Sequence, residues 1–205
     1  MVASSACSSV SSEPRVAEGS RDDVSSFGRR LWGAATLHAD TYEEVEADRG
    51  SIGQAALLVG IACAAAACGS LLRGGTTGLS SVALAVQVIV AGVLPALLWL
   101  GGSVFAYMVG ATFLRGPETE TDFPEVLRTT GFAFTPGLLL VAAGLPSASG
   151  LWIYYVTWLW IVVAGVVAIR QALDFTTLRA LATFGSAAVL LWLVVWGLAV
   201  VPLPL

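Results

Sequence analysis

The chain has 205 residues, of which 57% are hydrophobic and only 12% are charged, with a formal net charge of −4. A soluble globular domain typically carries about a quarter charged residues, so this composition indicates a protein whose solvent is lipid. Every basic residue is an arginine, and the sequence pI of 4.9 excludes the basic surface on which nucleic-acid phosphates bind.

The chain begins with a polar segment. Residues 1–26 are rich in serine and scattered charges, and they lack the apolar side chains needed to offset the entropy of ordering. We therefore expect a disordered tail over residues 1–26. Residues 27–49 form an interfacial juxtamembrane segment in our interpretation, with Trp32 near the lipid headgroups and Arg29 and Arg30 facing anionic lipid. A solvated juxtamembrane helix explains the same pattern equally well.

Charges divide the rest of the chain, because an unpaired charge at the bilayer centre costs at least ~2.5 kcal/mol. Uncharged stretches that cross a ~30 Å hydrocarbon core at ~1.5 Å per residue predict five helices within residues 50–205. They cover roughly residues 51–72, 81–113, 124–145, 151–170 and 179–201. The predicted fold class is an all-α integral membrane protein, a bundle of about five transmembrane helices with a disordered N-terminal tail.

The second stretch, 81–113, is too long for one perpendicular helix and short for two. We expect one helix kinked at Pro95, although Gly101-Gly102 leaves a break at that point open. Gly102, Ala106 and Gly110 are four apart and form a stripe of small residues, which is typical of close helix packing in membranes.

Turn and capping signals predict where the third helix begins and ends. Pro124 is a good first-turn residue, and Asp122 before it is a suitable N-cap. We expect a bend at Pro136. Residues 145–150 have a turn composition and separate this helix from the next.

The placement of arginine predicts how the chain is oriented. With a cytoplasmic N-terminus and five spans, nine of the ten arginines stay inside and only Arg73 lies outside. This asymmetry follows the positive-inside rule. We therefore expect a multi-pass protein of the cell membrane whose N-terminus is cytoplasmic and whose C-terminus is outside.

Candidates for catalysis are few. His38 is the only histidine and precedes the first span, so neither a Ser-His pair nor a histidine-rich metal site is expected within the membrane. Cys63 and Cys68 are five apart and lack zinc-site spacing. A phosphate-binding or dinucleotide-binding glycine loop is also missing. We predict no catalytic residue, no cofactor, no metal site and no enzymatic activity.

The charged residues expected at the cytoplasmic ends of the helices are the candidate partner-binding residues. Anchoring at the membrane interface is the simpler explanation for such charges. Arg170 and Asp174 are four apart, so they can pair on one helical face. The complete candidate set is Glu118, Glu120, Asp122, Glu125, Arg128, Arg170 and Asp174.

Three segments of the chain resemble segments of a known family. Thr-Tyr-Glu-Glu-Val-Glu-Ala-Asp (residues 41–48) resembles the segment before the first span in prokaryotic members of the Yip family, the Ypt/Rab-interacting protein-like membrane domain. Residues 123–136 are similar to its Leu-Arg, Gly-aromatic-Ala, Pro signature, and residues 166–177 to the end of its fourth helix. The resemblance extends from about residue 32 to 201, and the family's five-span topology agrees with the arginine count.

The resemblance implies a membrane-embedded organising or adaptor domain. The Asp-Leu-Tyr-Gly-Pro type segment of eukaryotic members, which serve in vesicle traffic with small GTPases, is not found here. We expect a non-enzymatic scaffold or adaptor that contacts the lipid bilayer and an unknown cytoplasmic protein partner. The sequence leaves open whether the chain forms a homo-oligomer.

The alternative is a small transporter or channel. Pro95 and Pro136 interrupt helices near mid-membrane, and Gln87 could line a path. An ion pathway usually carries an ionisable residue deep in a span. The spans of this chain hold none at that depth, which favours the scaffold.

Overall fold

The computed structural model describes residues 15–74, 80–113, 122–145 and 148–200, and every regular element in these ranges is helical. Among the described residues, three helices are long and apolar enough to cross a membrane, and there are four if the bent helix pair is counted as one span. A further, shorter apolar helix segment, Thr177–Leu190, follows them. The all-α membrane bundle expected from the sequence is therefore confirmed, with an approximate count of five.

The N-terminal part begins with helix α1 (Arg15–Ala35), which includes residues 15–26 of the expected tail. Residues 1–14 lie outside the described residues. The later turns of α1 pack on the bundle. There Phe27, Leu31 and Ala34 recur at helical spacing and contact the buried core.

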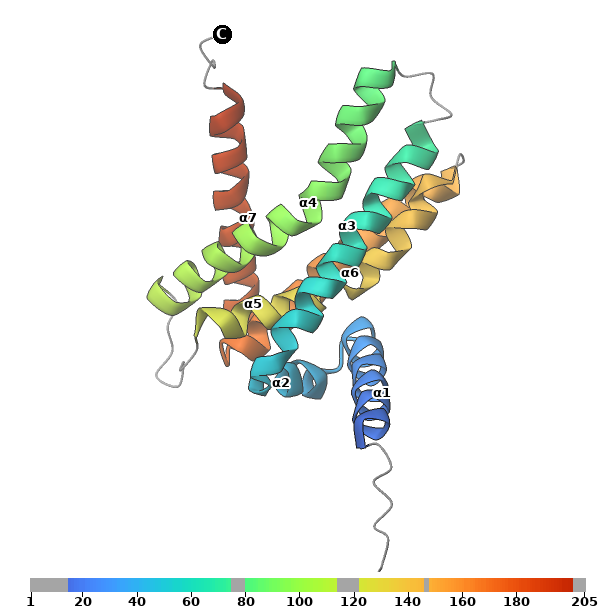
Figure 1. Cartoon of the computed structure of the whole chain (residues 1–205). Coiled ribbons are helices and arrows are strands. Elements are labelled where there is room, and N and C mark those ends of the chain that lie inside the picture. Colours follow the sequence, from blue (N-terminus) through green and yellow to red (C-terminus); the bar gives the residue numbers. More distant parts are fainter. Residues whose placement is uncertain (1–14, 75–79, 114–121, 146–147, 201–205) are drawn as a thin grey trace, which may run out of the picture.

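A second short helix connects α1 to the bundle. Helix α2 (Ala39–Ala47) is followed by the 3₁₀ turn η1 (Arg49–Ser51), which leads directly into the long helix α3 (Ile52–Gly74). Figure 1 shows α1 and α2 together at one end of the bundle, where α3 begins. The Tyr42 hydroxyl donates to the Ala34 carbonyl at 3.2 Å and joins α2 to α1.

Helix α4 (Ser81–Met108) is a single helix through Gly101 and Gly102, so the expected kinked helix is confirmed and the break is not found. It contains Pro95 and visibly bends near its middle (Figure 1). A π-helical turn, η2 (Val109–Phe113), continues it. Gly110 packs against Leu173, as the stripe of small residues predicted, whereas a side-chain carbon at Gly102 would meet open space.

The third span is bent and changes its helix type. Helix α5 (Phe123–Phe132) begins after the N-cap Asp122 with Pro124 in its first turn, as expected. It is followed by the 3₁₀ helix η3 (Thr135–Gly144), at an angle of 42°. The bend therefore occurs where Pro136 predicted it.

Helices α6 (Ala148–Ala172) and α7 (Thr177–Val200) complete the chain. In Figure 1, α3, α5 and α7 begin at the end where α1 and α2 lie, and α4 and α6 run in the opposite direction. The end of α7 is therefore at the far end of the bundle from α1 and α2 (Figure 1).

Small residues hold α3 against the bent span. Ala55, Ala62 and Gly69 are seven apart and lie on one face of α3. A side-chain carbon added at Gly131 would lie 2.6 Å from the Ala55 Cβ, and one at Gly137 would lie 2.6 Å from the Ala62 Cβ. At Gly69 the added carbon would lie 2.1 Å from the Leu140 carbonyl oxygen. The two backbones can approach this closely only because both sides of the contact carry small residues.

Candidate functional site

Charged residues from several elements meet at one end of the bundle, around helix α2. This helix is amphipathic: Tyr42 and Val45 are fully buried, and its glutamates lie toward the surface. Because α2 packs on α5 and α6 as well as α1, it brings together charges that are far apart in the sequence.

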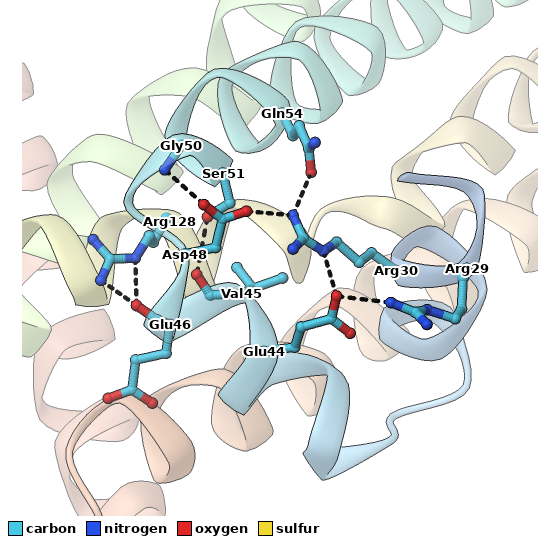
Figure 2. A network of polar contacts seen from close by, with 10 residues as sticks. All are labelled: Arg29, Arg30, Glu44, Val45, Glu46, Asp48, Gly50, Ser51, Gln54 and Arg128. Atoms are coloured by element: carbon cyan, nitrogen blue, oxygen red, sulfur yellow. Dashed lines mark hydrogen bonds and ion pairs between the residues drawn. The ribbon is translucent and has the colours of Figure 1, made fainter. Parts of the chain in front are cut away.

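On one side, Arg30 of α1 binds two carboxylates. Its Nε donates to Glu44 at 3.0 Å, and its Nη1 donates to Asp48 at 2.8 Å and to the Gln54 side-chain oxygen at 3.1 Å. Figure 2 shows the guanidinium enclosed by these three acceptors. Only 11% of the Arg30 side chain is exposed. This arginine was expected to face anionic lipid, but it is instead paired within the protein.

Asp48 also helps to connect α2 to α3. The second oxygen of Asp48 accepts from the Gly50 backbone N–H at 2.8 Å, and the Ser51 hydroxyl donates to the Val45 carbonyl at 2.9 Å. The hydrogen bond from Arg30, followed by that from Gly50, holds the pKa of Asp48 below its usual range. The connection from α2 into α3 is thus held by one hydrogen bond to a carboxylate and one to a backbone carbonyl.

On the other side, Arg128 of α5 binds the backbone of α2. Its Nε donates to the Glu46 carbonyl at 2.8 Å, and Nη2 donates to the same oxygen. The Glu125 carboxylate lies 3.6 Å from Nη2. Figure 2 shows the Glu46 side chain pointing away from this guanidinium while its carbonyl points toward it. Arg128 therefore satisfies the open carbonyl end of α2.

The Glu46 carboxylate lies among other carboxylates, and we call Glu43, Glu46, Glu125 and Asp174 the acidic rim. Burial raises the pKa of Glu46 to about 7, with repulsion from Asp174, Glu125 and Glu43 adding to the effect and Arg128 opposing it. Glu43 accepts from the Gln171 amide at 2.7 Å, which brings the end of α6 to the rim. The rim combines charges from α2, α5 and the turn after α6.

The raised pKa of Glu46 predicts a pH-dependent stability. The folded protein holds the Glu46 proton more tightly than the unfolded chain, whose pKa is near 4.5. Stability should therefore fall as the pH rises from about 4.5 to about 7. We expect Glu46→Gln to melt above wild type at pH 8 and at the same temperature at pH 4, measured as thermal unfolding in detergent. An equal difference at both pH values would contradict this assignment.

The structure places five of the seven sequence-predicted candidates, because Glu118 and Glu120 lie outside the described residues. Asp122 is exposed and caps α5, where its backbone N–H donates to Glu125 at 2.9 Å. Arg128 differs from the expected surface residue, since its side chain is only 6% exposed and contacts its own chain. Arg170 is exposed in the last turn of α6.

Asp174 is exposed but does not pair with Arg170, and the structure describes both residues. The backbone explains the difference. Asp174 has a φ of 49°, and the Phe175 N–H reaches back to the Arg170 carbonyl at 2.9 Å, so the helix has already ended. This left-handed turn takes Asp174 off the helical face that the spacing of four assumed.

Sequence reasoning missed Arg30, Glu43 and Glu46 as members of this region. The signal for the glutamates was available, because Tyr42 and Val45 at helical spacing among acidic residues indicate an amphipathic helix lying on the bundle. No sequence signal pairs Arg30 with Glu44 or Arg128 with the Glu46 carbonyl, because the partners are 14 and 82 residues apart.

Among the residues that the structure describes, no group of three His, Cys, Asp or Glu side chains could hold a metal ion. The arrangement is a helical membrane bundle with a charged cap at one end, which defines a multi-pass membrane protein. The family model described as the Yip1 domain matches residues 32–199, so the chain belongs to this family. No curated protein and no solved structure matches the chain.

Proposed function

We propose that this protein is a non-enzymatic membrane scaffold or adaptor that binds a protein partner through its acidic rim. The observation that carries the proposal is the gathering of Glu43, Glu46, Glu125 and Asp174 from three separate elements at one end of the bundle. Like charges at this density repel one another, so the folded protein gains from a partner that carries basic side chains. Such a partner also suits the net charge of −4.

Arg128 has a positioning role in this proposal. Because its guanidinium holds the end of α2 against α5, it sets where Glu43 and Glu46 lie relative to Glu125. Asp122, Arg170 and Asp174 are the exposed members of the sequence-predicted set, and we assign them to the same docking surface. We further propose that this end of the bundle is cytoplasmic, in line with the nine-to-one placement of arginine.

The residues of the candidate pathway give less support to a transporter or channel. The Gln87 amide, the candidate pathway residue, donates to the Ser70 hydroxyl at 3.1 Å and so has a partner within the protein. Pro95 and Pro136 are buried where the helices pack. These contacts favour the scaffold over the transporter or channel.

Cross-linking in native membrane vesicles tests both the surface and the orientation. A membrane-impermeant cross-linker should capture the partner in inside-out vesicles and not in right-side-out vesicles. Glu43→Gln/Asp174→Asn should lower capture by about three- to tenfold, because two exposed charge pairs are lost. Asparagine tolerates the left-handed conformation at 174, so the turn after α6 is retained.

The matched control is Asp40→Asn, which removes an exposed carboxylate at the opposite end of α2. It should capture the partner as wild type does. Equal capture by wild type and the double variant would overturn the docking surface. Capture only in right-side-out vesicles would overturn the orientation.

A further inference from the structure

A cavity lies between the last helix and the rest of the bundle. It has a volume of about 420 Å³ and is lined by residues of α4, α5, α6 and α7, and we call it the α7 cavity. Helix α7 packs tightly on α6 near its start, where a side-chain carbon added at Gly165 would lie 2.8 Å from the Phe184 ring. Its later turns diverge from α3 and α6 (Figure 1). The fold therefore leaves a space beside α7 that its own side chains do not fill.

The walls of the α7 cavity are almost wholly apolar. Four of the lining side chains carry a hydrogen-bond donor. The Trp99 indole N–H and the Ser103 and Thr130 hydroxyls donate to backbone carbonyls at 2.8, 2.6 and 2.6 Å. The buried indole N–H of Trp158 makes no hydrogen bond within the described part of the chain. A buried water needs about two to four polar partners, so walls with one unused donor favour an apolar occupant.

The α7 cavity reaches the lipid-facing surface of the bundle. Val162 of α6 and Ala188 of α7 both line it, and both are exposed. Helix α6 is long and apolar enough to cross a membrane. The medium at this opening between α6 and α7 is therefore hydrocarbon, and the bilayer itself supplies the apolar groups that can enter.

The length of the α7 cavity matches one leaflet of a bilayer. Its lining residues on α6 extend from Trp158, near the middle of the helix, to Ile169, close to the end at Ala172. Ile169 lies 11 residues beyond Trp158, or about 16 Å along the helix. Half of a ~30 Å hydrocarbon core is about 15 Å. Because Gln171 of α6 contacts the acidic rim, the leaflet is the one on the side of the rim.

We propose that the α7 cavity binds one acyl chain of a phospholipid from the leaflet on the side of the acidic rim, and that the chain enters between α6 and α7. Phospholipids carry most of the hydrocarbon chains of a bilayer, so they are the source that the opening meets first. A chain in this position contacts α4, α6 and α7 together and so joins the last helix to the bundle. The site does not depend on the docking surface of the proposed function.

Photo-crosslinking of the full chain in liposomes tests the site. The probe is phosphatidylcholine that carries a diazirine in the middle of one acyl chain, and mass spectrometry maps the labelled residues. Label is expected at Ala133 and Ile161, which line the cavity and are buried from bulk lipid. Leu58 and Val59 of α3 are also buried but do not line the cavity, and they should stay unlabelled. Absence of label at the first pair, or equal label at both pairs, would overturn the proposal.

A variant that fills the cavity provides a second test. Gly102 lines the α7 cavity, and a side-chain carbon at this position meets no atom within 4 Å, so Gly102→Leu should occupy the space without strain. The label at Ala133 and Ile161 should be lost. Gly60→Leu, at an exposed glycine of α3 with equal room, should be labelled as wild type is. Full label in Gly102→Leu, or equal loss in Gly60→Leu, contradicts the site. Labelling of wild type decides the matter where a variant does not fold.

Competition in detergent identifies the source of the chain. Excess unlabelled phosphatidylcholine should displace the probe from Ala133 and Ile161. A free fatty acid with the same chain, at the same concentration, should displace less of it, because the proposed ligand is the intact phospholipid. Stronger displacement by the fatty acid would show that the cavity takes a free fatty acid and would overturn the assignment to a phospholipid.

Discussion

Replacing Gly69 by alanine should destabilise the protein by about 3 kcal/mol or more. The added methyl carbon would lie 2.1 Å from the Leu140 carbonyl oxygen and 3.1 Å from the Leu140 carbonyl carbon. Both atoms are backbone, so the clash can be relieved only by moving η3 away from α3. Helices in lipid gain no hydrophobic free energy from association and depend on close van der Waals contact. Thermal unfolding of the purified variant in detergent measures the effect.

Gly60→Ala is the control in the same helix. A side-chain carbon at Gly60 meets nothing within 4 Å. We expect this variant to be as stable as wild type or more stable by up to about 1 kcal/mol, since alanine favours the helix. Equal melting temperatures for the two alanine variants would show that the α3–η3 contact is not tight at Gly69.

Replacing Arg30 by methionine should destabilise the protein by about 2–3 kcal/mol. The change leaves Glu44, Asp48 and Gln54 without the guanidinium that they share, at a position where only 11% of the arginine side chain is exposed. Removing one partner from a buried ion pair costs more than the pair contributes, because the remaining charges stay desolvated. The carboxylates here are 37% and 40% exposed, so water reduces the cost. Chemical or thermal unfolding in detergent measures it.

The neighbouring Arg29 provides the comparison. It also pairs with Glu44, at 2.9 Å, but 70% of its side chain is exposed. Exposed ion pairs contribute about 0.2–1 kcal/mol, so Arg29→Met should unfold nearly as wild type does. Similar losses in the two variants would mean that burial does not distinguish these arginines, and the network around Arg30 would have no special role.

The membrane helices could be predicted from sequence because charge is so costly in lipid. Helix α3, for example, extends from Ile52 to Gly74, where the charge pattern predicted residues 51–72. The packing of Phe27 and Leu31 of α1 against the bundle could not be predicted, since it depends on tertiary contacts. The ten-residue 3₁₀ form of η3 could not be predicted either. Long 3₁₀ helices are uncommon, and η3 lies in close contact with α3.

The candidate site was only partly predictable. Glu125 and Asp174 stand out in the sequence because a charge next to an apolar span marks the membrane interface. The position of each charged side chain, however, depends on the folded structure. Arg128 is buried because it donates to the Glu46 carbonyl at the end of α2. Asp174 lies after the end of α6, in a left-handed backbone conformation. The orientation of the bundle in the membrane stays a prediction from arginine placement.

The bend in α4 has a consequence for the membrane around the protein. This helix has 28 residues and is about 42 Å long, which exceeds a hydrocarbon core of about 30 Å. A straight, upright helix of this length would push apolar side chains into water or force the bilayer to thicken. Because α4 contains Pro95 and bends near its middle (Figure 1), the helix occupies less depth than its length. The bend of this proline-containing helix thus reduces the hydrophobic mismatch, so the surrounding bilayer need not thicken.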